Sequence, residues 1–352
     1  MKKERRKSKK VMVGNIVIGK DSQISVQSML KVPTVNIKAC MTQIEQLKTE
    51  GCDIIRVAIP DENSARAFSK IRKNTSIALV ADIHFDYKLA LMAAKAGANK
   101  IRLNPGNISS PEKIKLIAES AKAHGIPIRV GVNSGSMPKD LSNGKLTANK
   151  MVTAALREVE LLEKYDFDDI VIAIKSHDPA LTISANRLLA EKTHYPIHLG
   201  VTEAGLPSMG EIKSAIGIGS LLCDGIGDTI RVSLTGDPVQ EVIVGKRILK
   251  ACGLASSGID LVSCPTCGRC RVCVEKTALQ VLQNLPSTDK NLTVAVMGCE
   301  VNGPGEAKSA DIGIAGGNGF FIMFKKGKII GKFPQDQIVD RLIDEINYII
   351  EE

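Results

Sequence analysis

The residues whose types and spacing are best suited to chemistry are cysteines in the last third of the chain. Four of them recur at three-residue intervals in CPTCGRCRVC (264–273), and Cys299 follows 26 residues after Cys273. Thiolates gathered in a reducing compartment select zinc or iron–sulfur clusters. Structural zinc sites usually pair two separated knuckles, whereas one tight knuckle with a distant further ligand is common for iron–sulfur cubanes. The spacing therefore favours iron–sulfur over zinc.

The other four cysteines occur within helical patterns or at their ends. We interpret them as small buried hydrophobic residues, which is how most free cysteines behave. They are Cys40, Cys52, Cys223 and Cys252.

A second group of polar side chains lies at the ends of β-branched runs. These candidates are Arg56, Asp82, His84, Arg102, Asn104, Arg129, Asn133, Lys175, Thr202, Glu203, Arg231 and Ser233. Residues two apart on a strand share a face, so Arg102 and Asn104 point the same way. Five of the candidates are cations from five different runs, and an unpaired buried charge is costly. A small polyanion explains them together, and a diphosphate suits arginine forks and asparagine donors. The alternative is that each arginine pairs locally with a carboxylate at the rim.

The elements that must position these residues follow one rhythm from about residue 23 to 250. A short β-branched run alternates with a longer amphipathic segment eight times, which indicates parallel βαβ units. Eight units in this length fit a (β/α)8 TIM barrel better than an open doubly wound sheet. The carboxyl ends of barrel strands form one mouth, where the five cations would meet. The predicted strands are 24–29, 54–59, 77–83, 100–104, 127–133, 170–175, 196–202 and 229–234.

The pattern changes after the barrel. The small-residue stretch GLASSGID (253–260) predicts a linker. Beyond it we expect a strand at 292–298, a hairpin at 320–330 and a last helix at about 335–350. The predicted fold class is thus α/β, with a TIM barrel over 1–252 followed by a small α+β domain over 261–352.

Charge and hydropathy exclude several classes of protein. The net charge is +9, but the first ten residues, MKKERRKSKK, account for +6 of it. The chain has no Trp and few other aromatic residues, so it offers little for stacking on single-stranded nucleic acid. No apolar run approaches a membrane span, and no apolar segment of a secretory signal follows the basic start. We expect a cytoplasmic protein that binds neither nucleic acid nor membranes.

Six segments resemble a known family, the bacterial short form of 4-hydroxy-3-methylbut-2-enyl diphosphate synthase. They are KIRLNPGN (100–107), RVGVNSGS (129–136), HLGVTEAG (198–205), RVSLTGDP (231–238), SCPTCGR (263–269) and VMGCEVNGPGEAK (296–308). The resemblance implies a TIM barrel joined to a [4Fe-4S] domain. It also implies reduction of 2-C-methyl-D-erythritol 2,4-cyclodiphosphate with ring opening and loss of water, in isoprenoid precursor biosynthesis. Flavodoxin or ferredoxin supplies two electrons to this family. The resemblance further suggests a homodimer in which one chain's cluster domain serves its partner's barrel.

The resemblance also assigns roles to single residues. The cluster ligands fall on Cys264, Cys267, Cys299 and Glu306. A carboxylate among thiolates marks one iron that can exchange its ligand for a substrate oxygen. The substrate-binding positions fall on Arg56, Arg102, Asn104, Arg129, Asn133, Lys175, Thr202, Arg231, Ser233 and Asn302. The proton donor is either Glu203 or a protonated Asp82/His84 pair. Cys270 and Cys273 depart from the family motif, and they are competing ligands, ligands of a second metal, or idle.

One rival from another class stays open at this point. It is a zinc-stabilised barrel that binds a phosphorylated or pterin-like ligand without redox chemistry.

Overall fold

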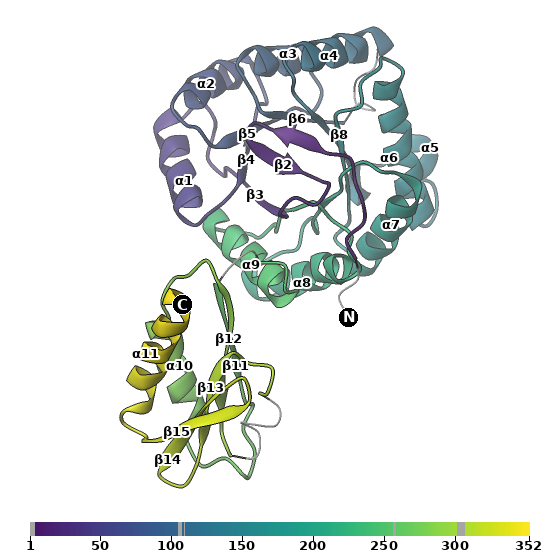
Figure 1. The fold of residues 1–352 in the computed structure, drawn as a ribbon. Coiled ribbons are helices and arrows are strands. Elements are labelled where there is room, and N and C mark those ends of the chain that lie inside the picture. The colour runs from purple at the N-terminus through teal and green to yellow at the C-terminus, as the bar shows by residue number, and fades with distance from the viewer. Residues whose placement is uncertain (1–3, 105–107, 109, 256–257, 301–306) are drawn as a thin grey trace. The chain divides into compact units, whose positions relative to one another are not determined.

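The computed structural model describes residues 4–104, 108, 110–255, 258–300 and 307–352. The chain divides into two compact units, Met1–Leu254 and Ala255–Glu352. The first unit is the predicted barrel of parallel strands ringed by helices, and the second is a smaller α+β unit (Figure 1). No helix within the described part of the chain is both long and apolar enough to traverse a lipid bilayer.

The eight predicted barrel strands are confirmed. They are β3 (Ser25–Met29), β4 (Ile54–Ala58), β5 (Ala78–Asp82), β6 (Lys100–Leu103), β7 (Ile128–Asn133), β8 (Ile170–Lys175), β9 (His198–Leu199) and β10 (Thr229–Ile230). Each is parallel to its neighbours, and β10 returns to pair with β3. A parallel bridge between Ile172 and Ile197 joins β8 to β9 and completes the circle. The last two strands are shorter than predicted, at two residues each.

Helices follow the strands and cover the outside of the barrel (Figure 1). They are α1 (Ile37–Thr49), α2 (Glu62–Lys73), α3 (Tyr87–Lys95), α4 (Pro111–Ala123), α5 (Lys139–Ser142), α6 (Ala148–Glu163), α7 (Pro179–Lys192), α8 (Pro207–Cys223) and α9 (Pro238–Ala251). Asp61, Asp178 and Asp237 each accept a backbone N–H at a helix start, which fixes where the strand-to-helix loop ends. Strand residues of one parity pack on these helices, so residues of the other parity face the barrel axis.

A short hairpin, β1 (Val11–Val13) and β2 (Ile16–Ile18), precedes the barrel and was not predicted. Val13 and Ile18 pack against Ile54 and Ala78, the first residues of β4 and β5. The hairpin therefore covers the amino ends of the strands. In Figure 1 it is seen in the middle of the ring of helices.

The basic segment before this hairpin is part of the barrel unit. Arg5 and Arg6 lie 3.5 and 3.6 Å from the carboxylate of buried Asp228, and the Ser8 hydroxyl donates to the same carboxylate at 2.7 Å. Lys9 pairs with Asp168. Three of the basic residues at the start of the chain therefore form ion pairs within the barrel unit.

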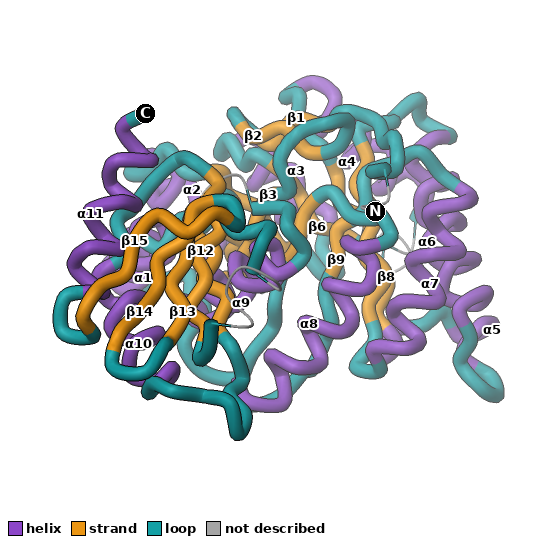
Figure 2. The backbone as a smooth tube through the Cα atoms, turned by 60° about the horizontal axis from the view of Figure 1, so that its bottom comes forward, coloured by secondary structure: helices purple, strands orange, loops and turns teal. Residues whose placement is uncertain are grey.

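The second unit is a five-stranded sheet with two helices. Its elements are β11 (Gly258–Ser263), α10 (Val274–Asn284), β12 (Asn291–Met297), β13 (Ile312–Gly316), β14 (Phe320–Lys325), β15 (Lys328–Pro334) and α11 (Ile338–Glu351). The strand order is β11-β12-β13-β14-β15, with the first three parallel and the last two antiparallel. Both helices pack on one face of the sheet (Figure 2), through residues such as Val281 and Leu342.

The predicted linker 253–260 was wrong at its end. Residues 258–260 begin β11, because their backbone pairs in register with β12 from Gly258 opposite Asn291 onward. Local composition cannot reveal that partner, which lies more than thirty residues away in the sequence.

Candidate active site

The carboxyl ends of the barrel strands gather the predicted cations. In register, Asp82 of β5 lies opposite Arg102 of β6, which lies opposite Arg129 of β7. Asn133 pairs in the same way with Lys175. Arg102, Arg129 and Lys175 are buried, and Arg56 and Arg231 are nearly so. The structure thus brings these five cations from five strands to one mouth.

Asp82 is a centre of this arrangement. Arg56 and Arg102 each approach its carboxylate to 3.3 Å, and His84 Nε2 lies at 3.3 Å as well. Burial alone would raise the pKa of Asp82, but Arg56, His84 and Arg102 outweigh it and hold that pKa below its usual value. Asp82 is therefore an anion at neutral pH.

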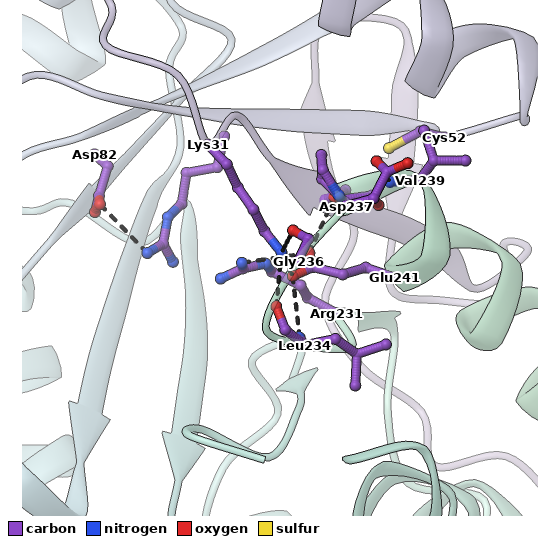
Figure 3. Close-up of polar contacts among 12 residues, drawn as sticks. Lys31, Cys52, Asp82, Arg231, Leu234, Gly236, Asp237, Val239 and Glu241 are labelled. Carbon is purple, nitrogen blue, oxygen red and sulfur yellow. Dashed lines mark hydrogen bonds and ion pairs between the residues drawn. The ribbon is translucent and has the colours of Figure 1, made fainter. Parts of the chain in front are cut away.

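A second buried carboxylate, Glu241 of α9, was missed by the sequence analysis. It lies 3.4 Å from Arg231 and 3.0 Å from Lys31, and it accepts from the Leu234 N–H at 3.1 Å. Figure 3 shows these groups converging on Glu241. The available signal was a Glu between Val239 and Val242 in the amphipathic segment that follows the last predicted barrel strand. Glu241 fixes Arg231 and the loop after β10, so the rim-carboxylate alternative holds for Arg231.

Arg129 and Lys175 form no ion pair among the described residues. Burial, together with the neighbouring arginines, lowers the pKa of both groups well below ordinary values. The Nε atoms of Arg56, Arg102, Arg129 and Arg231 also lack a hydrogen-bond partner in the described part of the chain. Two carboxylates cannot neutralise this number of cations, so the mouth is built to receive an anion.

Small residues leave room for that anion. At Gly131, a Cβ would lie 3.6 Å from both Arg102 and Arg129. At Gly200, it would lie 2.6 Å from the Lys175 ammonium nitrogen, so only glycine leaves that side chain in place.

The remaining predicted mouth residues differ in burial. Asn104 is buried, and its Oδ1 has no hydrogen-bond partner among described residues. Asn133, Thr202 and Ser233 are half-buried, whereas Glu203 is exposed. Glu203 has a φ of +52°, a left-handed conformation that non-glycine residues rarely adopt. Such strain is often found at functional positions.

In the second unit, the topology brings the predicted thiol ligands to one sheet edge. Cys264 directly follows β11 and Cys299 nearly follows β12, which are adjacent parallel strands. The Cys264 N–H donates to Val296 O at 3.0 Å, and Cys267 lies three residues beyond. All three are free thiols. Soft thiolates that leave one sheet edge together fit an iron–sulfur cluster chemically.

Two predicted residues of this site, Glu306 and Asn302, lie outside the described residues. Among the residues that are described, no three metal-ligating side chains are close enough together to hold a metal ion. Beside buried Cys299 is a cavity of about 360 Å³ that is also lined by Arg269, Arg271 and Glu300.

The other cysteines differ in burial. Cys270 donates to Val272 O at 3.0 Å and lies against Gly298, so it is partly packed within the unit. Cys40 and Cys52 are buried as predicted. The prediction was wrong for Cys223, which is exposed at the end of α8, 3.9 Å from half-buried Cys252. The sequence pattern indicated a helix here, but it did not show that the last turn of that helix is exposed.

Comparison with known proteins covers both units. Residues 8–246 match the GcpE TIM-barrel domain, and residues 260–348 match the GcpE protein C-terminal domain. Curated relatives include proteins from Ruminiclostridium cellulolyticum (54% identical), Clostridium tetani (51%) and Caldanaerobacter subterraneus (52%). The alignments cover 98%, 98% and 100% of this chain and 98%, 100% and 100% of those proteins. Each is named 4-hydroxy-3-methylbut-2-en-1-yl diphosphate synthase (flavodoxin).

Two solved structures share a fold with about 70% of this chain. Dihydropteroate synthase from Stenotrophomonas maltophilia aligns with a TM-score of 0.53 at 15% identity, over 69% of this chain and 98% of that one. Type I 3-dehydroquinate dehydratase from Clostridium difficile aligns with a TM-score of 0.52 at 14% identity, over 70% and 98%. At such identities the likeness establishes the fold and says nothing about a ligand.

Proposed function

The chain belongs to the GcpE family, and from that premise we propose how its two units carry out the reaction for which its relatives are named. The activity is that of an oxidoreductase, 4-hydroxy-3-methylbut-2-en-1-yl diphosphate synthase, in isoprenoid precursor biosynthesis. The observation that carries the proposal is the buried, unneutralised cation cluster at the mouth, in a chain whose relatives make a diphosphate.

The substrate is 2-C-methyl-D-erythritol 2,4-cyclodiphosphate, and the mouth binds its diphosphate. Arg129 and Lys175, which have no carboxylate partner among described residues, make the direct charge contacts. Arg56 and Arg102 are oriented by Asp82, and Arg231 is oriented by Glu241. Arginine forks held in this way present fixed donors to phosphoryl oxygens. Asn104, Asn133, Thr202 and Ser233 add uncharged donors at the rim.

The second unit holds a [4Fe-4S] cluster through Cys264, Cys267, Cys299 and Glu306. When bound, the cluster supplies the electrons and a Lewis-acid iron for C–O bond cleavage. The sheet edge supports this assignment because it delivers Cys264 and Cys299 from adjacent strands. Asn302, four residues before Glu306 in the sequence, is proposed to contact substrate.

The proton that the reaction consumes comes from Glu203 or from the His84 side of the Asp82/His84 pair. The strained backbone of Glu203 supports the first choice, since a costly conformation persists where it positions a side chain. The ionised state of Asp82 argues against Asp82 itself as the donor.

Flavodoxin is the electron donor named for the relatives, and we propose it for this chain, with ferredoxin as the substitute. A homodimer and a cytoplasmic location, where thiols stay reduced, complete the proposal. The rival zinc-stabilised barrel without redox chemistry is not favoured, because every relative described above is named as a redox enzyme.

Anaerobic purification with iron and sulfide counting, followed by cyclodiphosphate reduction with reduced flavodoxin, tests the function. We expect a brown protein that bleaches on reduction and converts the substrate. Cys299→Ser should lose iron and activity, and Glu306→Gln should lose activity but keep much of its iron. The matched control is Cys270→Ser/Cys273→Ser, which should keep both. A colourless zinc protein, or an iron-free control with an active Glu306→Gln, would contradict the assignment.

A further inference from the structure

The interior of the barrel contains three buried polar side chains that the proposed chemistry does not use. Gln27 of β3, Lys100 of β6 and His198 of β9 are all 0% exposed. The Gln27 amide atoms, Lys100 Nζ and both His198 ring nitrogens have no hydrogen-bond partner among the described residues. Barrel interiors are normally filled with Val, Ile and Leu, and each unpartnered buried polar group requires an explanation.

Strand alternation turns Lys100 and His198 toward the barrel axis, beneath the mouth. Ile101 packs in the core between strands and helices, so Lys100 and Arg102 on either side of it point toward the barrel axis. Lys100 lies opposite Val80 in register, one inward-facing position below the Asp82–Arg102 pair. Ile197 and Leu199 pack outward in the same way, which turns His198 inward. The amine of Lys100 therefore lies directly below the anion site.

The surroundings of Lys100 are cationic. The charged and titratable groups that face this part of the interior are Arg56 of β4, Asp82 of β5, Arg102 of β6, Arg129 of β7, Lys175 of β8, His198 of β9 and Arg231, which directly follows β10. Burial first, then Arg129 and Arg56, lower the pKa of Lys100 to about 7. Burial first, then Lys175 and Arg129, lower the pKa of His198 well below its ordinary value, so His198 is neutral.

We propose that Lys100 takes up a proton when a diphosphate occupies the mouth, so that the barrel interior gains positive charge on binding. One solvent proton adds to Nζ, and no other bond changes. An anion close to a neutral amine favours the ammonium form. The inference rests on the proposed function, because the anion is the substrate's diphosphate. Opening of the cyclic diphosphate frees one more ionisable oxygen, whose charge the new ammonium offsets.

Titration calorimetry measures this proton directly. The oxidised holoenzyme is titrated with 2-C-methyl-D-erythritol 2,4-cyclodiphosphate, without an electron donor, at about pH 7.5 in buffers of different ionisation enthalpy. The cyclic diphosphate does not titrate near this pH, so the slope of heat against buffer enthalpy counts protons taken up by the protein. From the shifted pKa we expect roughly 0.7 proton per barrel. Lys100→Met should lose most of that uptake and bind about tenfold more weakly.

The control variant is Gln27→Met, which removes another buried polar side chain from the barrel interior but no titratable group. Its slope of heat against buffer enthalpy should match that of the wild type. A Lys100→Met slope equal to that of the wild type would assign the proton to Lys175 and overturn the inference. A zero wild-type slope with saturable binding would also overturn it, whether or not any variant folds. No saturable binding would refute the proposed function, and this inference with it.

Discussion

Glu203 combines exposure, a position beyond a barrel strand and a left-handed backbone with φ +52°. If it delivers the proton, Glu203→Gln should lower kcat by about 10²- to 10⁴-fold with little change in KM. Glu203→Gly should lose as much activity while raising the free energy of unfolding by about 1 kcal/mol, because glycine adopts this φ without strain. Steady-state kinetics and denaturant unfolding check the two effects.

The control for Glu203 is Arg129→Ala, which should mainly raise KM because it removes diphosphate binding. A Glu203→Gln enzyme with wild-type kcat would move the proton donor to His84.

Asp82 makes a prediction about pH. Its pKa is held below the ordinary value in the folded state, so its ion pairs stabilise the fold above about pH 4 and this contribution is lost as the pH falls further. Asp82→Asn leaves Arg56 and Arg102 without their carboxylate and should lower the free energy of unfolding by about 3 kcal/mol at neutral pH. The difference between the unfolding midpoints of the two proteins should be constant from pH 7 down to about pH 4 and should narrow as the pH falls from there toward 3. A difference that stayed constant down to about pH 3 would refute the assignment.

Sequence reasoning found the cations at this scale but not their partners. Arg56, Arg102, Arg129, Lys175 and Arg231 stand at strand ends that a local pattern can locate. Glu241 could not be paired with Arg231 or Lys31, since both contacts depend on how α9 and the segment after β3 fold onto the mouth. The burial of Lys100 could not be predicted either, because the local sequence does not show whether the first residue of a strand faces solvent or the barrel interior.

At the scale of elements, the strand and helix rhythm was predictable because each barrel unit repeats the same local pattern. The hairpin Val11–Ile18 was not, because three-residue strands carry almost no periodicity. The contacts of the basic segment before it were not predicted either, and its arginines lie close to Asp228 at the barrel's amino end.

That contact predicts the effect of charge removal near the start of the chain. Arg5→Ala/Arg6→Ala should lower the thermal unfolding midpoint, because buried Asp228 loses both cations. Lys7→Ala/Lys10→Ala removes the same charge from exposed positions and should leave the midpoint unchanged. Differential scanning fluorimetry of the two double variants decides the matter. Equal midpoints would return the segment to the role of a solvated arm.

At the scale of the whole molecule, chemistry is divided between two compact units. The anion site lies wholly in Met1–Leu254, and the proposed cluster thiols lie wholly in Ala255–Glu352. Electrons from one unit must nevertheless reach substrate held by the other during turnover. Composition and spacing suggested both proposed sites, because each depends on strand ends within its own unit. Whether the two sites that cooperate belong to one chain or to two is a property of the assembly, and local sequence does not encode it.

A mixing experiment separates these cases. Arg102→Ala should disable the anion site and leave the cluster intact, whereas Cys299→Ser should do the reverse, so each variant alone should be nearly inactive. If the cooperating units come from different chains of a homodimer, a random mixture contains half heterodimers, each with one intact pair of sites. Activity should then recover to roughly a quarter of the wild-type value per chain. Native mass spectrometry of isotope-labelled partners must first show that subunits exchange. With exchange shown, an inactive mixture would assign both sites to the same chain, because every chain would then carry one defect.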